Sequence, residues 1–249
     1  MSTHRFTYDR AIADSFPSVI GGAIHAVGVS NGPSSPGLLE AFRAEQGVVR
    51  ARIGERPLSE LPSLAAWRRT FRAFGVDPTA YRSAAEALLR RLTKQGSLPS
   101  INTLVDIGNL VAIRYGLPVA MFDQATVTGG TTVRFADGSE RFTDLGSGET
   151  ESPATGEVIF IDDAGLVSAR RWCWRQSAES ASGPHTTEVL VTVEGHHQGV
   201  AADIQAAVAD LEALIRTHAA AQDLATGIVT ATSRTFAGLS DERHHGPRS

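Results

Sequence analysis

The segment Ser100–Asp123, with the sequence SINTLVDIGNLVAIRYGLPVAMFD, places three polar side chains on one face of an otherwise apolar helix. Asn102, Asp106 and Asn109 are spaced i, i+4 and i+7 and therefore line up, while an apolar packing stripe runs beside them. Two amides and a carboxylate are costly to bury without hydrogen-bond partners. They either hold the chain's own backbone in place or face a pocket that binds the polar groups of a ligand.

The composition limits the classes of protein to consider. Of 249 residues, 42% are hydrophobic and 20% charged, which is typical of a globular protein with a sizeable core. No stretch approaches the ~18–20 apolar residues of a membrane span, so we expect a cytoplasmic protein without membrane contact. The single cysteine, Cys173, excludes an intrachain disulfide and a multi-cysteine zinc site. The net charge of −4 offers no general attraction to nucleic acid, so RNA binding requires a local basic patch.

The apolar spacing predicts an α-rich N-terminal part, residues 1–99, followed by a core of mixed structure, residues 100–235. Helices are expected at Leu38–Arg52, Leu61–Gly75, Tyr81–Gln95, Ser100–Tyr115 and Val200–His218. The apolar, glycine-spaced run Pro17–Val29 predicts a buried strand pair, or one strand with a turn at Gly21-Gly22.

Strand-like composition dominates between the last two of these helices. Strands are expected at Val119–Phe122, Thr131–Phe135, Arg141–Thr143, Glu157–Ile161, Leu166–Arg175 and Thr187–Val193, with a hairpin turn at Asp162–Gly165. We therefore predict one α+β domain of layered β-sheets over residues 1–235, with a long C-terminal helix and a frayed tail over residues 236–249.

The run Arg170–Gln176, RRWCWRQ, combines tryptophan with arginine. In an extended strand, Trp172 and Trp174 share one face, and Arg171 and Arg175 share the other. Such side chains stack on bases and bind phosphates, which suggests an RNA-binding surface. The alternative is that the tryptophans pack in the core while the arginines cap the edge of the sheet.

Glu194 ends an apolar strand immediately before Gly195, where a carboxylate can project into a cleft. There it could bind an ammonium group, act as a general base if burial raised its pKa, or remain a solvated charge. His196 and His197 follow, but ligands on adjacent residues of an extended chain point in different directions, so we predict no metal site. We expect no cofactor either, because the glycine-rich nucleotide-binding motifs are missing, as are the usual hydrolase motifs.

Read together, these segments resemble the B3/B4 domain, the editing module of the phenylalanyl-tRNA synthetase β subunit. That family's pattern runs V-D-V-T-N-Y-V, G-Q-P-L-H-A-F-D, a V-I-x-D strand, A-L-A-G-I-M-G-G and a strand ending in L-E. The corresponding segments here are VDIGNLV at Val105–Val111, GLPVAMFD at Gly116–Asp123, VIFID at Val158–Asp162 and VTVE at Val191–Glu194. The order and spacing agree over about residues 100–195.

The resemblance implies a mixed α+β fold around a pocket that accepts a wrongly attached amino acid at the tRNA 3′ end and hydrolyses its ester. Asn109 matches the family's pocket asparagine, and Glu194 matches the glutamate that recognises the misplaced amino acid. The family's threonine and histidine are replaced by Gly108 and Ala120, and its glycine-rich segment by the tryptophan-rich residues 171–176. The pocket should therefore take a ligand other than the family's tyrosyl ester.

The resulting hypothesis is a free-standing module that binds aminoacyl-tRNA or a related RNA end, with hydrolysis of a mischarged ester in trans as its candidate activity. The expected amino-acid-binding residues are Asn102, Asp106, Asn109 and Glu194, and the expected RNA-binding residues are Arg171, Trp172, Trp174 and Arg175. The sequence assigns no catalytic residue and no oligomeric state. The alternatives are a non-catalytic protein that binds a small amino-acid-like or carboxylate metabolite through Arg171 and Arg175, and an interaction scaffold with a vestigial pocket.

Overall fold

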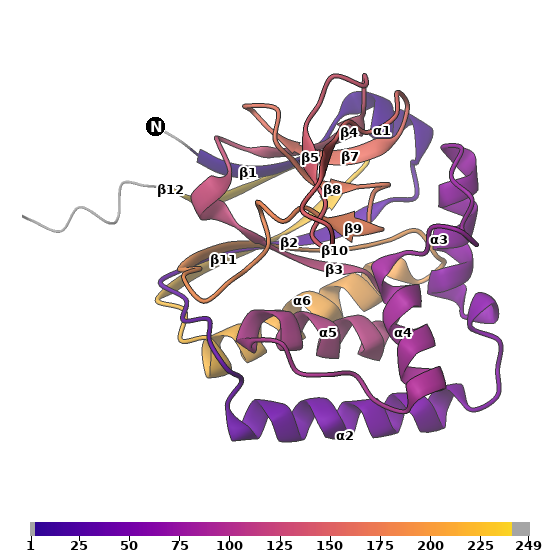
Figure 1. The fold of residues 1–249 in the computed structure, drawn as a ribbon, viewed down its shortest axis with the longest axis vertical. Helices are drawn as coiled ribbons and strands as arrows, with labels where there is room; N and C mark the ends of the chain where they lie inside the picture. The colour runs from indigo at the N-terminus through magenta and orange to yellow at the C-terminus, as the bar shows by residue number, and fades with distance from the viewer. Residues whose placement is uncertain (1–2, 241–249) are drawn as a thin grey trace, which may run out of the picture.

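Two β-sheets are stacked above a layer of helices in the computed structural model, which describes residues 3–240 (Figure 1). The upper sheet has six strands in the order β12-β1-β4-β7-β8-β9, the lower sheet has four in the order β11-β2-β10-β3, and β5 and β6 form a small separate ribbon. The strands are β1 Thr3–Tyr8, β2 Ile20–Val27, β3 Val119–Asp123, β4 Thr131–Phe135, β5 Phe142–Thr143, β6 Thr150–Glu151, β7 Val158–Asp162, β8 Val167–Arg170, β9 Arg175–Gln176, β10 Glu188–Gly195, β11 Asp223–Thr230 and β12 Thr235–Ser240. The protein is therefore a mixed α+β fold.

Most helices cover the lower sheet and one end of the molecule, whereas one short helix lies against the upper sheet. The helices are α1 Arg10–Ser15, α2 Pro36–Ile53, α3 Pro62–Ala73, α4 Ala84–Gln95, α5 Thr103–Tyr115 and α6 Val200–His218, with short 3₁₀ turns at Leu58–Glu60 and Gln124–Thr126. Helices α5 and α6 lie beneath the four-stranded sheet, α2 is the outermost layer, and α3 and α4 stand at the right-hand end in Figure 1.

Local sequence signals set where two of these helices begin and end. The Ser83 hydroxyl accepts a hydrogen bond from the Glu86 amide at the start of α4, and Gly96 ends α4 in the left-handed conformation. At α5, the Asn102 side chain accepts a hydrogen bond from the Val105 amide at the start, and Gly116 ends the helix in the left-handed conformation. Helix α4 begins later than predicted, because residues 78–80 form a turn and Ser83 caps the helix only after it.

The core has two main layers on opposite faces of the four-stranded sheet. Val191 and Val193 face α5 and α6 and join the helix-side cluster. Leu190 belongs to the cluster between the two sheets, together with Phe6 and Phe160 of the six-stranded sheet. Because side chains alternate along a strand, Glu194 shares the parity of Leu190 and faces the space between the sheets.

Most of the predicted helices and strands are confirmed within a few residues, and α6 and β4 have the predicted bounds. The hairpin between β7 and β8 is also confirmed. Pro17–Val29, however, holds the single strand β2 rather than a strand pair. Strands β1, β11 and β12 were missed. Since β12 pairs with β1, the frayed tail predicted from residue 236 is wrong up to residue 240, and residues 241–249 lie outside the described part.

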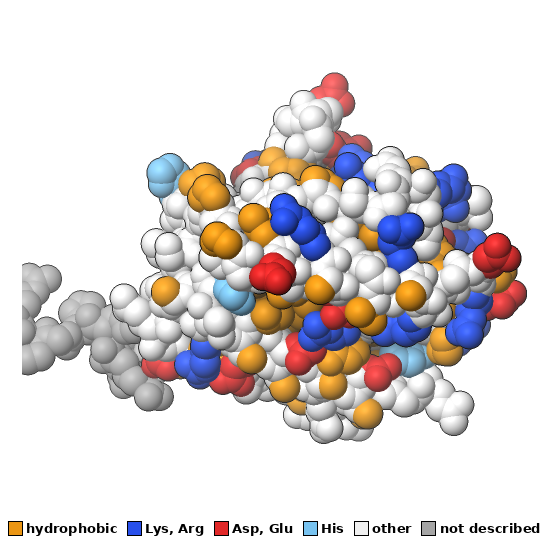
Figure 2. All heavy atoms as spheres, turned by 90° about the horizontal axis from the view of Figure 1, so that it is seen from below, with side chains coloured by type: hydrophobic (Ala, Val, Ile, Leu, Met, Phe, Trp, Pro, Cys, Tyr) orange, Lys and Arg blue, Asp and Glu red, His pale blue; other side chains and the backbone are white. Residues whose placement is uncertain are grey.

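The described surface carries few large apolar side chains. Val48, Ile101, Leu145 and Ile228 are the large hydrophobic residues that are exposed among residues 3–240. The underside of the molecule mixes charged and apolar side chains without one dominant apolar area (Figure 2). No helix within residues 3–240 has the length and apolar character needed to cross a membrane.

Candidate functional site

A small cleft opens at the end of the molecule where β3, β9 and β10 meet the start of α4. Its wall is mainly apolar, and Phe122 and Phe160 from the two sheets both contribute to it. The polar side chains that line it are Arg175, Gln176, Thr192 and Glu194. An apolar recess with a few polar groups is the usual form of a small-ligand site.

Glu194 is the buried carboxylate of this cleft, with 2% of its surface exposed. Its Oε1 atom accepts hydrogen bonds from the Tyr8 hydroxyl at 2.6 Å and from the Trp172 indole nitrogen at 3.0 Å. Burial raises the pKa of Glu194 to about 7, although the two donors act in the opposite direction. A carboxyl group with a pKa near neutrality can both take up and release a proton at physiological pH. Glu194 is therefore a candidate for proton transfer in this cleft.

Tyr8 reaches Glu194 because the facing position on β2 is glycine. Tyr8 lies on β1 of the six-stranded sheet, whereas Glu194 lies on β10 of the other sheet. A Cβ atom at Gly21 would stand 2.3 Å from the Tyr8 hydroxyl oxygen and 3.5 Å from the Glu194 side chain. The missing side chain at Gly21 thus allows the two sheets to share a hydrogen bond.

Gly21→Ala is expected to lower the free energy of unfolding by about 2–4 kcal/mol, through overpacking and loss of the Tyr8–Glu194 hydrogen bond. Adding Tyr8→Phe removes the clashing oxygen, so the double variant should lose less stability than the sum of the single variants. Urea titration measures these changes. Gly47→Ala is the matched control, because a Cβ atom on this exposed part of α2 meets nothing within 4 Å. Strict additivity of the two changes would contradict this account.

Trp172 lies in a turn rather than a strand, which corrects the prediction for Leu166–Arg175. Strand β8 ends at Arg170, and Arg171 and Trp172 have left-handed backbone conformations with φ of 45° and 60°. This rare geometry for large residues turns the Trp172 indole inward, where it is fully buried against Trp67 and His196. Trp172 therefore donates to Glu194 from inside the molecule and does not form part of the exposed surface on which RNA binding was predicted.

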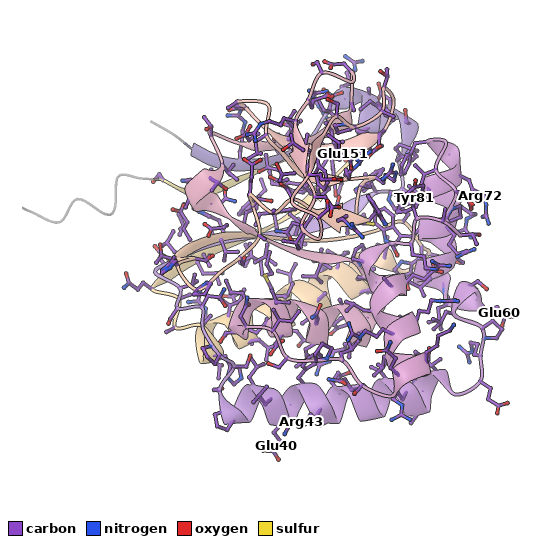
Figure 3. All side chains as sticks on the ribbon, viewed as in Figure 1. Glu40, Arg43, Glu60, Arg72, Tyr81 and Glu151 are labelled. Carbon is purple, nitrogen blue, oxygen red and sulfur yellow. The ribbon has the colours of Figure 1, made fainter. Side chains whose placement is uncertain are left out.

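Trp174 stands at the rim of the cleft between two guanidinium groups. The guanidinium carbons of Arg171 and Arg175 lie 4.5 and 4.6 Å from the centre of its ring, and Arg171 also lies 3.8 Å from the ring of Tyr81. Figure 3 shows Tyr81 beside α3, at the same end of the molecule. Of these predicted RNA-binding residues, Arg175 and Trp174 reach the surface, with 44% of the Arg175 side chain exposed. The Arg171 side chain is mostly buried, with 15% of its surface exposed.

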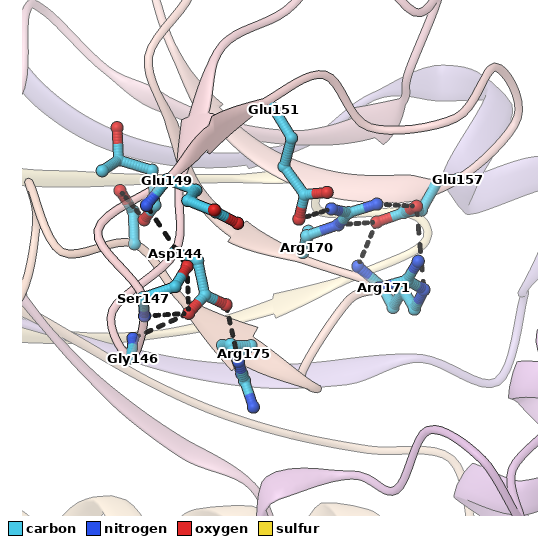
Figure 4. A network of polar contacts seen from close by, with 11 residues as sticks. Asp144, Gly146, Ser147, Glu149, Glu151, Glu157, Arg170, Arg171 and Arg175 are labelled. Carbon is cyan, nitrogen blue, oxygen red and sulfur yellow. Dashed lines mark hydrogen bonds and ion pairs between the residues drawn. The ribbon is translucent and has the colours of Figure 1, made fainter.

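A network of acids and arginines supports the Trp172 turn (Figure 4). Glu157 accepts two hydrogen bonds from the Arg170 guanidinium, at 2.8 and 2.9 Å, and one from the Arg171 amide at 3.0 Å. Arg175 forms an ion pair with Asp144 at 2.6 Å. Since Arg171 and Arg175 both have acidic partners within the chain, capture of a metabolite carboxylate by this pair is the less favoured alternative.

The polar face of α5 serves the chain itself. Asn102 caps α5 through the Val105 amide, and Asp106 is fully buried and accepts hydrogen bonds from the hydroxyls of Ser34 and Ser100 and from the Ile101 amide. In the structure both side chains hold the chain's own backbone and loops, and neither Asn102 nor Asp106 lines the Glu194 cleft.

Asn109 does not line the cleft. Helix α5 packs on the face of the four-stranded sheet opposite to the one that Glu194 occupies. The predicted convergence of Asn109 and Glu194 on a shared cavity is therefore not found.

Asp106→Ala is expected to cost about 3 kcal/mol of unfolding free energy, because it leaves the donors around a fully buried carboxylate without an acceptor. Asn109→Ala on the same helix is the control and should change stability by less than about 0.5 kcal/mol, since the Asn109 side chain has no hydrogen bond within residues 3–240. Equal effects of the two changes in a denaturation experiment would rule out this division of roles.

The buried histidines do not form a metal centre around Glu194. His197 pairs with Asp203 at 2.8 Å, whereas His196 lies among aromatic rings and burial lowers its pKa to about 3. Elsewhere, His4, His25 and Glu188 bring potential ligand atoms within 4.8 Å of one another. However, His25 Nδ1 accepts the Leu239 amide at 3.0 Å. A neutral His25 then carries its proton on Nε2, which points to Glu188 and has no lone pair for a metal.

Comparison with known protein families gives a match over more than half of this chain. The model of the family described as the B3/4 domain matches residues 66–219. The phenylalanine–tRNA ligase β subunit of Nocardia farcinica is 36% identical over 135 residues, covering 54% of this chain, and that of Shewanella oneidensis is 34% identical over 83 residues, covering 33%. This chain matches 15% and 10% of the length of those two proteins. A solved N-terminal fragment of the Pyrococcus horikoshii phenylalanyl-tRNA synthetase β subunit superposes with a TM-score of 0.44 and 11% identity, covering 85% of this chain and 48% of the fragment.

Proposed function

Because this chain belongs to the B3/4 domain family, we propose that its cleft binds the aminoacyl end of a tRNA and hydrolyses a mischarged ester in trans. The observation that carries this proposal is the buried Glu194, whose pKa of about 7 places it between the charged and neutral forms at physiological pH. The alternative of a small free metabolite lacks a comparable feature, because the arginines at the rim are paired with acids.

In the proposed complex, the amino-acid side chain enters the apolar part of the cleft. Trp172 fills the inner side and already donates to Glu194, so the space suits a side chain smaller than that of tyrosine. The terminal adenine stacks at the rim on the exposed Arg175 guanidinium, which itself lies over the Trp174 ring. Base stacking of this kind contributes about 1–3 kcal/mol per base.

The chemical step uses Glu194 as a general base. Its free Oε2 atom takes a proton from a water molecule, the water oxygen bonds to the ester carbonyl carbon, and the bond from that carbon to the ribose oxygen breaks. The ribose oxygen then takes up a proton as it leaves. Proton transfer to a positioned carboxylate is typically worth about 10²–10⁴-fold in rate.

The test is the decay of a panel of aminoacyl-tRNAs with small and large side chains, with and without the protein. We expect faster decay for at least one small apolar amino acid, with a rate that rises as the pH passes through about 7, because Glu194 must lose its proton to act as a base. Glu194→Gln keeps an oxygen that can accept from Tyr8 and Trp172 but should lose about 100-fold or more in rate.

Glu212→Gln on α6, remote from the cleft, is the control and should behave as the wild type. If every ester decays equally with and without the protein, the catalytic proposal is wrong. Binding measured by fluorescence anisotropy at two salt concentrations separates the remaining ligand classes, since RNA binding weakens steeply with salt whereas binding of a neutral amino acid does not.

A further inference from the structure

We infer that the end of the molecule formed by the C-terminus of α2 and by α3 and α4 binds the phosphate backbone of an RNA duplex. Residues 50–94 contain ten arginine or lysine residues and four aspartate or glutamate residues, a net charge of +6 in a chain whose net charge is −4. The remainder of the chain is therefore acidic, and the positive charge is concentrated on one helical segment. A local basic surface of this kind attracts nucleic acid despite an acidic total.

Six basic side chains of this segment are exposed and form no ion pair. Arg56, Arg69, Arg72, Arg90, Arg91 and Lys94 have no carboxylate within ion-pair distance among residues 3–240. Arg68, by contrast, is bound to Glu86 at 2.7 Å and ties α3 to α4. Figure 2 shows the blue side chains mainly toward the right, where Figure 1 places α3 and α4, and Figure 3 shows Arg72 pointing outward from α3. Arginine dominates this set, and its planar fork suits phosphate oxygens.

A second, more open cleft lies within this basic end. Arg52 and Arg56 line it. Among residues 3–240, the Arg52 guanidinium donates to the backbone carbonyls of Ile113 and Arg114 and pairs with no carboxylate. Asp203 is the acidic residue of the lining.

The start of α3 also opens into this second cleft. Leu61 occupies the N-cap and provides no side-chain hydrogen bond to the first turn. Ser63, in that first turn, lines the cleft and is 7% exposed, and its hydroxyl has no partner among residues 3–240. These groups together form a binding site for a phosphate: the unsatisfied amides at the helix start, an unpartnered hydroxyl and two guanidinium groups.

The two clefts flank a single helix. Ala84 at the start of α4 lines the first cleft, and Leu89, further along α4, lines the second. An RNA whose 3′ end enters the first cleft therefore meets basic side chains of α3 and α4 as it continues across the molecule. The choice of RNA as the polyanion rests on the proposed function, whereas the basic surface itself does not.

The experiment uses uncharged tRNA, so that binding by the basic end is measured without the aminoacyl group. Fluorescence anisotropy at several salt concentrations is compared for wild type, Arg69→Glu/Arg72→Glu and Arg90→Glu/Arg91→Glu. We expect each double variant to weaken binding by at least about tenfold. The slope of log affinity against log salt should also fall by about one for each phosphate that the variant no longer neutralises.

Arg10→Glu/Arg43→Glu is the matched control, with the same charge change at two exposed arginines outside residues 50–94. The inference is overturned if this control weakens binding as much as the α3 and α4 variants do, or if wild type does not bind uncharged tRNA. The proposed function is tested separately by deacylation. Equal deacylation rates for wild type and Glu194→Gln would count against that function, whereas binding of uncharged tRNA by the wild type and the α3 and α4 variants tests the basic surface alone.

Discussion

Replacing Glu157 with alanine is expected to lower the free energy of unfolding by about 3–5 kcal/mol, because it leaves the buried Arg170 without its main counter-charge. Glu157 and Arg170 each expose only 4% of their side chains and are joined by two hydrogen bonds. Glu157 also accepts the amide of Arg171, a residue in the left-handed conformation. Its loss should therefore loosen the Trp172 turn as well.

The structure provides a matched control for this change, because a second acid contacts the same arginine from the surface. The Glu151 carboxylate also pairs with Arg170, but 51% of that side chain is exposed. Glu151→Ala should cost less than about 1 kcal/mol, as is usual for solvated ion pairs. Urea denaturation of both variants measures the difference, and equal losses would show that burial does not set the strength of this network.

The second large effect concerns pH and comes from Glu194 and His196. Burial raises the pKa of Glu194 from 4.5 to about 7, so the folded state holds this proton more tightly than the unfolded state does. The resulting stabilisation is complete below pH 4.5 and is lost as the pH rises through 7, a total of about 3 kcal/mol. Burial lowers the pKa of His196 from 6.5 to about 3, so its contribution is complete above pH 6.5 and is lost as the pH falls toward 3, a total of about 5 kcal/mol.

Between pH 4.5 and 6.5 these two contributions oppose each other, and the wild type should show a nearly flat stability profile there. Glu194→Gln removes the stabilisation that decreases with rising pH. The unfolding free energy of this variant should therefore rise steadily with pH up to about 6.5. His196→Leu removes the rising contribution and should give a profile that falls toward pH 7. Both variants are measured by urea titration between pH 4 and 8, and profiles parallel to that of the wild type would contradict the assignment of these protons.

Periodicity was sufficient to predict α5 and α6, because each helix has an apolar stripe, and α5 also has capping residues at both ends. The sequence of α5 could not, however, reveal the role of Asp106. Its donors include Ser34, which lies 72 residues away, and no local pattern indicates that a distant loop will satisfy a carboxylate.

The position of Glu194 at the end of a strand was sufficient to select it as a candidate site residue. The residues that surround it could not be predicted. The Tyr8 hydroxyl that binds it comes from 186 residues away, on a strand that the sequence analysis missed. The alternating pattern around Trp172 predicted a continuous strand, because local propensity contains no sign of a left-handed conformation at two bulky residues. That conformation is held by long-range contacts, namely the buried indole and the acid that receives the Arg171 amide.

The antiparallel pairing of β1 with β12 sets Thr3 opposite Ser240, so the two ends of the described chain emerge side by side from one border of the six-stranded sheet. A module whose entry and exit points are neighbours can be spliced into a surface loop of a host protein without pulling that loop apart.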